Sequence, residues 1–182
     1  KEAGVDSQPV AVSAPVTTAS LRAWLGASLN ALEYSREAID SLNVFPIADG
    51  DTGTNMFLTV EACYEAISAL PDTASLAEAS GVVAEAAIWG ARGNSGVILA
   101  EILRGIVDSF LDTTDGASLS IETVHTALAN ASTRAYSAVS RPVEGTILTV
   151  ARVAAEAASV PPSARDDRSL LRHLLSISSH MH

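Results

Sequence analysis

Apolar residues recur along most of the chain at the three- and four-residue spacing that is typical of amphipathic helices. Proline and glycine clusters interrupt this pattern at intervals. The periodic segments between them predict seven helices, over residues 20–42, 55–70, 75–89, 95–111, 121–139, 146–160 and 163–177. No alternating pattern of the kind found in strands competes with them, so the sequence predicts an all-α fold.

The predicted helices are joined by short connections, which favours an antiparallel up-and-down bundle or closed barrel of about seven to eight helices. In such a fold, junctions separated by a pair of helices lie at the same end. The glycine-containing junctions near residues 50, 93 and 143 meet this condition, so we expect them to share one rim. The domain is expected to span residues 19–177, after a flexible leader at 1–18 and before a tail at 178–182 that resembles a tag remnant.

The composition suits a domain with a packed core and argues against several functions. The chain has 182 residues, of which 48% are hydrophobic and 18% charged, enough apolar content for one folded domain. A formal charge of −10 and scattered basic residues argue against nucleic-acid binding. Apolar runs of membrane-spanning length are missing and Cys63 is the only cysteine. We therefore expect a cytoplasmic protein, not integral to a membrane, with a buried structural thiol.

The lysine content narrows the possible nucleotide chemistry. Lys1 is the only lysine of the chain, so neither a phosphate-loop lysine nor the lysine of a protein-kinase strand can be present. If the protein handles a nucleotide, the phosphate charge must be neutralised by metal ions, arginine side chains and helix N-termini.

The first glycine-containing junction carries two carboxylates, Asp49 and Asp51, separated by a glycine. Glycine and proline make a regular helix unfavourable here, so both carboxylates can turn toward one cation. Mg²⁺ takes oxygen ligands, usually one or two carboxylates with water and phosphate, and Thr52, Thr54 and Asn55 add further oxygen atoms. The alternative is an Asx turn followed by a helix N-cap, without any metal.

A calcium loop of the EF-hand type also begins Asp-x-Asp, but its later positions do not match. Gly53 stands where an oxygen ligand is needed, and Thr54 stands where the turn glycine belongs. Val60 occupies the position of the bidentate glutamate. The sequence therefore favours Mg²⁺ over Ca²⁺.

The second and third junctions each place glycine and small polar residues directly before an apolar helix. Free N–H groups and the helix dipole favour an anion at such a position, so the second junction is a candidate phosphate cradle with Arg92 beside it. The third junction adds another helix start at Gly145 and Thr146. Either junction alone is equally typical of an ordinary turn or capped helix start.

Together, the three junctions are far more specific. They read Asn-Val-Phe-Pro-x-x-Asp-Gly-Asp-Thr-Gly-Thr-Asn-Met at 43–56, Gly-Ala-Arg-Gly-Asn-Ser-Gly-Val-Ile-Leu at 90–99 and Arg-Pro-Val-Glu-Gly-Thr-Ile-Leu-Thr-Val at 141–150. In this order and spacing they closely resemble the DAK2 or DhaL-like kinase domain, over roughly residues 20–160. Within that family the chain is most similar to the N-terminal nucleotide-binding domain of bacterial fatty acid kinase catalytic subunits.

The resemblance implies an all-α barrel that binds ATP or ADP and two Mg²⁺ ions at one rim. It implies that Asp49 and Asp51 are the catalytic metal ligands, and that Asn43 is the nearest match, with different spacing, to a third aspartate of the dihydroxyacetone kinase branch. It further assigns phosphate and nucleotide contacts to residues of the second and third junctions: Arg92, Gly93, Asn94, Ser95, Gly96, Gly145, Thr146 and Ile147. Leu99 and Ile147 are the candidates for apolar walls of the adenine pocket.

The function that the resemblance implies is phosphorylation of a fatty acid, held by a separate fatty-acid-binding protein, to an acyl phosphate for phospholipid synthesis. A domain of this kind is expected to be inactive without its partner and the C-terminal regions of the full-length family members, through which it could also form a homodimer. Two alternatives stay open: the nucleotide-binding subunit of a dihydroxyacetone kinase, and a non-catalytic nucleotide-sensing domain.

Overall fold

A computed structural model describes residues 15–43, 49–111 and 120–159 of the chain. These residues form six α-helices: α1 (Thr18–Leu42), α2 (Thr52–Ser68), α3 (Leu76–Gly90), α4 (Gly93–Asp108), α5 (Ile121–Ser137) and α6 (Ile147–Ser159). The all-α prediction is confirmed. The seventh predicted helix, at 163–177, lies outside the described residues.

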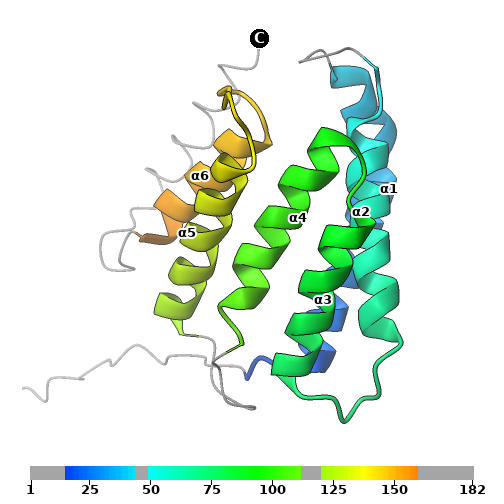
Figure 1. Ribbon diagram of the computed structural model, residues 1–182, viewed down its shortest axis with the longest axis vertical. Helices are drawn as coiled ribbons and strands as arrows, with labels where there is room; N and C mark the ends of the chain where they lie inside the picture. The colour runs from blue at the N-terminus through cyan, green and yellow to red at the C-terminus, as the bar shows by residue number, and fades with distance from the viewer. Residues whose placement is uncertain (1–14, 44–48, 112–119, 160–182) are drawn as a thin grey trace, which may run out of the picture.

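The helices run up and down in sequence order, and each packs against the next, with α2 also packed against α4. In Figure 1 the junctions α1–α2, α3–α4 and α5–α6 lie at the upper end of the bundle, while α2–α3 turns at the lower end. The expectation that the three glycine-containing junctions share one end of an antiparallel bundle is therefore confirmed.

Two helices begin earlier than the sequence predicts. Helix α2 starts at Thr52 and not at Asn55, and α4 starts at Gly93 and not at Ser95. The prediction that glycine makes a regular helix unfavourable at these positions is wrong. Here glycine lets one helix lie directly on another, because a side chain at Gly53 would collide with the backbone of α1.

The hydrophobic core lies between α1, α2, α3 and α4. Its largest fully buried side chains include Leu25, Ile67, Leu76 and Val83. Cys63 is also buried in it, and burial raises the pKa of its thiol to about 12, as expected of a structural thiol. None of the described helices is both long and apolar enough to cross a membrane.

Candidate functional site

The first junction brings together the predicted metal ligands Asn43 and Asp49. Asn43 follows the last turn of α1, and its side-chain Nδ2 donates a hydrogen bond of 2.6 Å to Oδ1 of Asp49. Asp49 and Asp51 are both exposed and flank Gly50, whose φ of 68° only glycine adopts readily. Two carboxylates and an amide thus stand at the entrance to α2.

These donors fit a magnesium ion. Among the described residues, no group of three or more His, Cys, Asp and Glu side chains could hold a metal. Mg²⁺ does not require such a group, because one or two carboxylates suffice when water and phosphate oxygens complete its octahedron. The solvent-exposed Asp49 and Asp51 leave room for those further ligands.

The first turn of α2 is held by a residue that the sequence patterns do not reveal. Asp40, in the last turn of α1, accepts hydrogen bonds through Oδ1 from the backbone N–H groups of Gly53 (2.6 Å) and Thr54 (3.1 Å). Its Oδ2 accepts the hydroxyl of Thr54 at 2.7 Å. Thr54, predicted to contact the nucleotide or its metal, therefore has its hydroxyl turned toward α1.

The charge of Asp40 is stabilised by these contacts. Burial alone would raise the pKa of its carboxyl, but the hydrogen bonds from Thr54 and Gly53 and the nearby charge of Arg36 lower it below its ordinary value. A carboxylate at a helix N-terminus also interacts favourably with the helix dipole. Asp40 thus caps α2 from a neighbouring helix, in place of Asp51, whose own side chain makes no capping bond.

The second junction lies directly on the first. Ser95 donates its hydroxyl to the carbonyl oxygen of Thr52 at 3.4 Å. Gly93 has a φ of 57°, and a Cβ there would lie 2.3 Å from Nδ2 of Asn55. The backbone of the glycine turn can approach Asn55 only because no side chain intervenes. The predicted metal loop and the predicted phosphate turn therefore form one continuous surface.

Thr59 is a further residue that the sequence patterns do not reveal. It is fully buried, donates its hydroxyl to the carbonyl of Asn55 at 2.7 Å and accepts the backbone N–H of Arg92 at 3.2 Å. A Cβ on Gly96 would lie 2.5 Å from the same hydroxyl oxygen. Thr59 therefore anchors the start of α4 to α2.

The N-terminus of α4 carries no side-chain cap. Arg92 occupies the N-cap position without a capping bond, and its guanidinium donates instead to the carbonyls of Trp89 and Ala91. Within the part of the chain that the structure describes, no side chain accepts a bond from the N–H groups of Gly93, Asn94 or Ser95. Such a helix start can bind an anion.

The third junction, before α6, is held together by Glu144. Its carboxylate accepts hydrogen bonds from the hydroxyls of Tyr136 (2.6 Å) and Thr149 (2.7 Å) and from the guanidinium of Arg152 (3.1 Å). The bonds from Tyr136, Thr149 and Arg152 lower the pKa of Glu144 to about 2. The loop is therefore tied to α5 on one side and to α6 on the other.

The predicted nucleotide contacts of the third junction lie next to this carboxylate. Gly145, with a φ of 80°, donates its N–H to Oγ1 of Thr149 at 2.7 Å. Thr146 donates its hydroxyl to the carbonyl of Val143 at 2.8 Å and accepts the N–H of Leu148 at 3.3 Å. Ile147 is half-buried at the first position of α6.

Leu99, predicted as a wall of the adenine pocket, is half-buried on α4 and packs against the core. The third junction shares the upper end of the bundle with the other two (Figure 1), but among the described residues no hydrogen bond joins it to them. The structure thus assembles the first two junctions through direct contacts and places the third at the same end.

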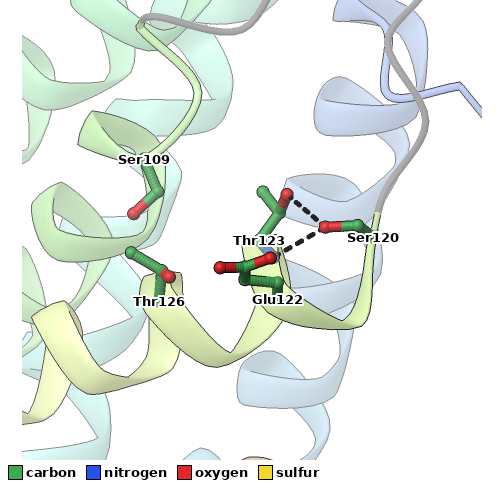
Figure 2. Close-up of a pocket in the computed structure, with 5 residues that line it drawn as sticks. All are labelled: Ser109, Ser120, Glu122, Thr123 and Thr126. Carbon is green, nitrogen blue, oxygen red and sulfur yellow. Dashed lines mark hydrogen bonds between the residues drawn. The ribbon is translucent and has the colours of Figure 1, made fainter.

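Two hollows lie at the other end of the bundle. An apolar groove of about 410 Å³ is lined by α1, α4 and α5 through residues that include Leu21, Trp24, Phe110 and Leu128. A small polar pocket of about 200 Å³ lies beside the start of α5 (Figure 2). Ser120 accepts the N–H of Thr123 at 3.0 Å in this pocket, so part of its polar lining is the N-cap of α5.

The fold and this end of the molecule define an all-helical domain with an aspartate loop, a glycine turn and an uncapped helix start on one surface. The chain belongs to the DAK2 domain family, whose model matches residues 46–178. The family indicates a kinase-related, nucleotide-binding domain.

Relatives among curated proteins agree with this assignment. The chain is 40% identical over 129 residues to the protein YloV of Bacillus subtilis, covering 71% of the chain and 23% of YloV. It is 38% identical over 149 residues to an uncharacterized protein of Staphylococcus epidermidis, covering 81% of the chain and 26% of that protein. An uncharacterized protein of Staphylococcus saprophyticus is 41% identical over 144 residues, covering 75% and 24%. The chain therefore spans about a quarter of the length of these relatives.

Proposed function

We propose that this chain is an ATP- and Mg²⁺-dependent phosphotransferase domain whose acceptor is a fatty acid held by a separate lipid-binding protein. The observation that carries the proposal is the contact between the first two junctions. Ser95 bonds to Thr52 and Gly93 lies against Asn55. A carboxylate pair for a metal and a free helix start for phosphate therefore adjoin each other.

In this proposal, Asp49 and Asp51 hold the metal, and Asn43 orients Asp49 through the bond of 2.6 Å. When bound, Mg²⁺ neutralises the phosphate oxygens and fixes their geometry, which supplies most of what phosphoryl transfer requires. The N–H groups of Gly93, Asn94 and Ser95 bind phosphate oxygens at the positive end of the α4 dipole. Thr146 and Ile147 contact the rest of the nucleotide.

The two candidate acceptors, a carboxylic acid and an alcohol, make different demands on the site, and only the closer family resemblance favours the fatty acid. A fatty-acid carboxylate is ionised at neutral pH, so its oxygen attacks the γ-phosphorus directly. The bond from that phosphorus to the ADP oxygen breaks, and ADP leaves with the electron pair. An alcohol such as dihydroxyacetone must also lose a proton to a base. Glu144, the carboxylate of the third junction, is a poor base because hydrogen bonds lower its pKa to about 2.

Calorimetric titration of ATP tests the nucleotide site. The unaltered chain should bind ATP only when Mg²⁺ is present, and ATP at about 100 times its dissociation constant should stabilise the fold by roughly 2.7 kcal/mol. Asp49→Ala or Asp51→Ala should weaken binding by at least about 100-fold, while the fold stays intact because both side chains are exposed. Glu65→Ala, an exposed carboxylate on α2, is the control. Unchanged binding in Asp51→Ala would contradict the proposal.

Turnover distinguishes the acceptors. ATP consumption should require a fatty-acid-loaded partner protein, and hydroxylamine should trap the acyl phosphate as a hydroxamate. Turnover with dihydroxyacetone would favour the sugar-kinase alternative. Mg²⁺-dependent binding without turnover on either acceptor, even in the full-length protein, would favour a nucleotide-sensing domain.

A further inference from the structure

The start of α2 is fixed to α1 at one point, by packing and by hydrogen bonds together. A Cβ on Gly53 would lie only 2.4 Å from the carbonyl oxygen of Arg36 and 3.0 Å from Cβ of Ile39. The two helices are therefore as close here as their backbones allow. At the same point, Asp40 accepts the N–H groups of Gly53 and Thr54 and the hydroxyl of Thr54.

This arrangement determines where the neighbouring carboxylate lies. Asp51 is the residue directly before the first turn of α2, and its backbone carbonyl accepts the N–H of Asn55 at 2.8 Å. Because that turn is bound to α1, the backbone of Asp51 is held relative to Asn43 and Asp49, which follow the end of α1. The side chain of Asp51 makes no capping bond and remains available for a ligand.

The same contacts occupy the anion-binding position of α2. The N–H groups of Gly53 and Thr54 already bind a carboxylate, so a phosphate cannot use them without displacing Asp40. The N-terminus of α4 adjoins this helix start through the hydrogen bond from Ser95 to Thr52. Its N-cap residue makes no side-chain capping bond.

We propose that Asp40 is a positioning residue of the metal–nucleotide site: by capping α2 from α1 it holds Asp51 in place for Mg²⁺ and directs phosphate to the N-terminus of α4. This inference rests on the proposed function. It assigns Asp40 no direct contact with the metal, because both of its oxygens are bound to the first turn of α2.

Paired variants separate positioning from ordinary stabilisation. Asp40→Ala removes the cap, whereas Asp40→Asn keeps an oxygen that can accept both N–H groups. Ser75→Ala removes a helix cap at the other end of the bundle, where the Ser75 hydroxyl accepts the N–H of Glu78 at 3.1 Å. For each variant of the full chain, calorimetry gives the apparent Mg²⁺ dissociation constant at saturating ADP, and thermal unfolding gives the midpoint.

We expect Asp40→Ala and Ser75→Ala both to lower the unfolding midpoint. Only Asp40→Ala should raise the apparent Mg²⁺ dissociation constant, by about tenfold, as is typical when an outer contact of a metal site is lost. Asp40→Asn should restore it to within about threefold of the unaltered chain. Hydrogen exchange at the amides of Gly53 and Thr54 should quicken in Asp40→Ala and not in Ser75→Ala.

The inference is overturned if Asp40→Ala weakens Mg²⁺ no more than Ser75→Ala does, or if Asp40→Asn is as weak as Asp40→Ala. If Asp40→Ala does not fold, Thr54→Val removes only the bond to Oδ2 and should still weaken Mg²⁺ by about threefold; no weakening in Thr54→Val then overturns the inference. Failure of the unaltered chain to bind ADP with Mg²⁺ would instead overturn the proposed function, and this inference with it.

Discussion

The N-termini of α2 and α4 lie side by side and have opposite arrangements. Both follow a glycine-containing junction, and the N-cap side chain makes no capping bond in either. At α2, the carboxylate of Asp40 supplies the missing acceptor from α1. At α4, no described side chain does so. One helix start is closed by a built-in negative charge, and the other is open.

This difference indicates a division of roles at one end of the bundle. A closed helix start is a rigid base for the carboxylates that precede it, which suits a metal site. An open helix start offers N–H groups to an anion. Under the proposed function, the pair would let a chain whose only lysine is Lys1 bind a nucleotide, since a metal and the α4 dipole could together neutralise phosphate.

The largest effect is expected at the glycine turn that separates the two helix starts. Gly93→Ala should reduce the free energy of unfolding by about 2 kcal/mol or more, because alanine is strained at positive φ and its Cβ would collide with Asn55. Urea unfolding measures this loss. Gly145→Ala is the matched control, since its φ is also positive but nothing lies within 4 Å of its Cβ. Equal losses in both variants would show that the contact with Asn55 has no energetic weight.

A smaller effect is expected when the N-terminus of α4 receives a carboxylate, as the N-terminus of α2 has in Asp40. Asn94→Asp puts a carboxylate in the first turn of α4 and should stabilise the fold by about 0.3–1 kcal/mol through the helix dipole. The same charge should weaken ATP by about tenfold or more, since it would lie beside the N–H groups proposed to bind phosphate and like charges even about 10 Å apart repel by about 1.7 kcal/mol at an effective dielectric constant of about 20. Thermal unfolding and calorimetry measure the two effects. ATP affinity unchanged in Asn94→Asp would place the phosphates elsewhere.

The smallest effect is expected at the start of α6, where Glu144 accepts hydrogen bonds from Tyr136 of α5 and from Thr149 and Arg152 of α6. Its pKa falls from 4.5 to about 2 on folding, so its charge stabilises the fold above about pH 4.5 and that contribution is lost as the pH falls toward 2. Glu144→Gln should therefore lose less stability than the unaltered chain between pH 6 and pH 3 in urea titrations. Glu65→Gln, at an exposed position on α2, is the control, and its loss of stability over this pH range should match that of the unaltered chain. Parallel pH profiles for Glu144→Gln and the unaltered chain would contradict the assignment.

The fold was predictable because helix periodicity and its proline and glycine interruptions are local properties of the sequence. The common end of the three junctions followed from chain reversal alone. The exact helix starts did not, because Gly53 and Gly93 are placed by contacts with other helices: Gly53 with α1, and Gly93 with Asn55 of α2. A pattern within one segment carries no record of such contacts.

The site was predictable only in part, for the same reason. Asn43 and Asp49 are close in sequence and their side chains share a hydrogen bond, while their role as metal ligands stays a prediction. Asp40 acts on a residue 13 positions away and stands on α1 among other acidic residues, so nothing in the sequence distinguishes it from Glu37. Thr59 is one threonine within an apolar helix; one of its partners, Asn55, lies on the same helix, and the other, Arg92, is 33 positions away.

The buried thiol of Cys63 can report how often the helices around it open. The chain has one cysteine, and it lies between α2 and α3 with its sulfur near the carbonyl of Val83. A thiol reagent can reach this sulfur only when the two helices separate. The rate of alkylation at a fixed pH therefore measures how often they separate. In the proposed function, nucleotide held by the metal loop and the N-terminus of α4 would stabilise the packed helices and slow this alkylation, so occupancy of the site could be followed without a label.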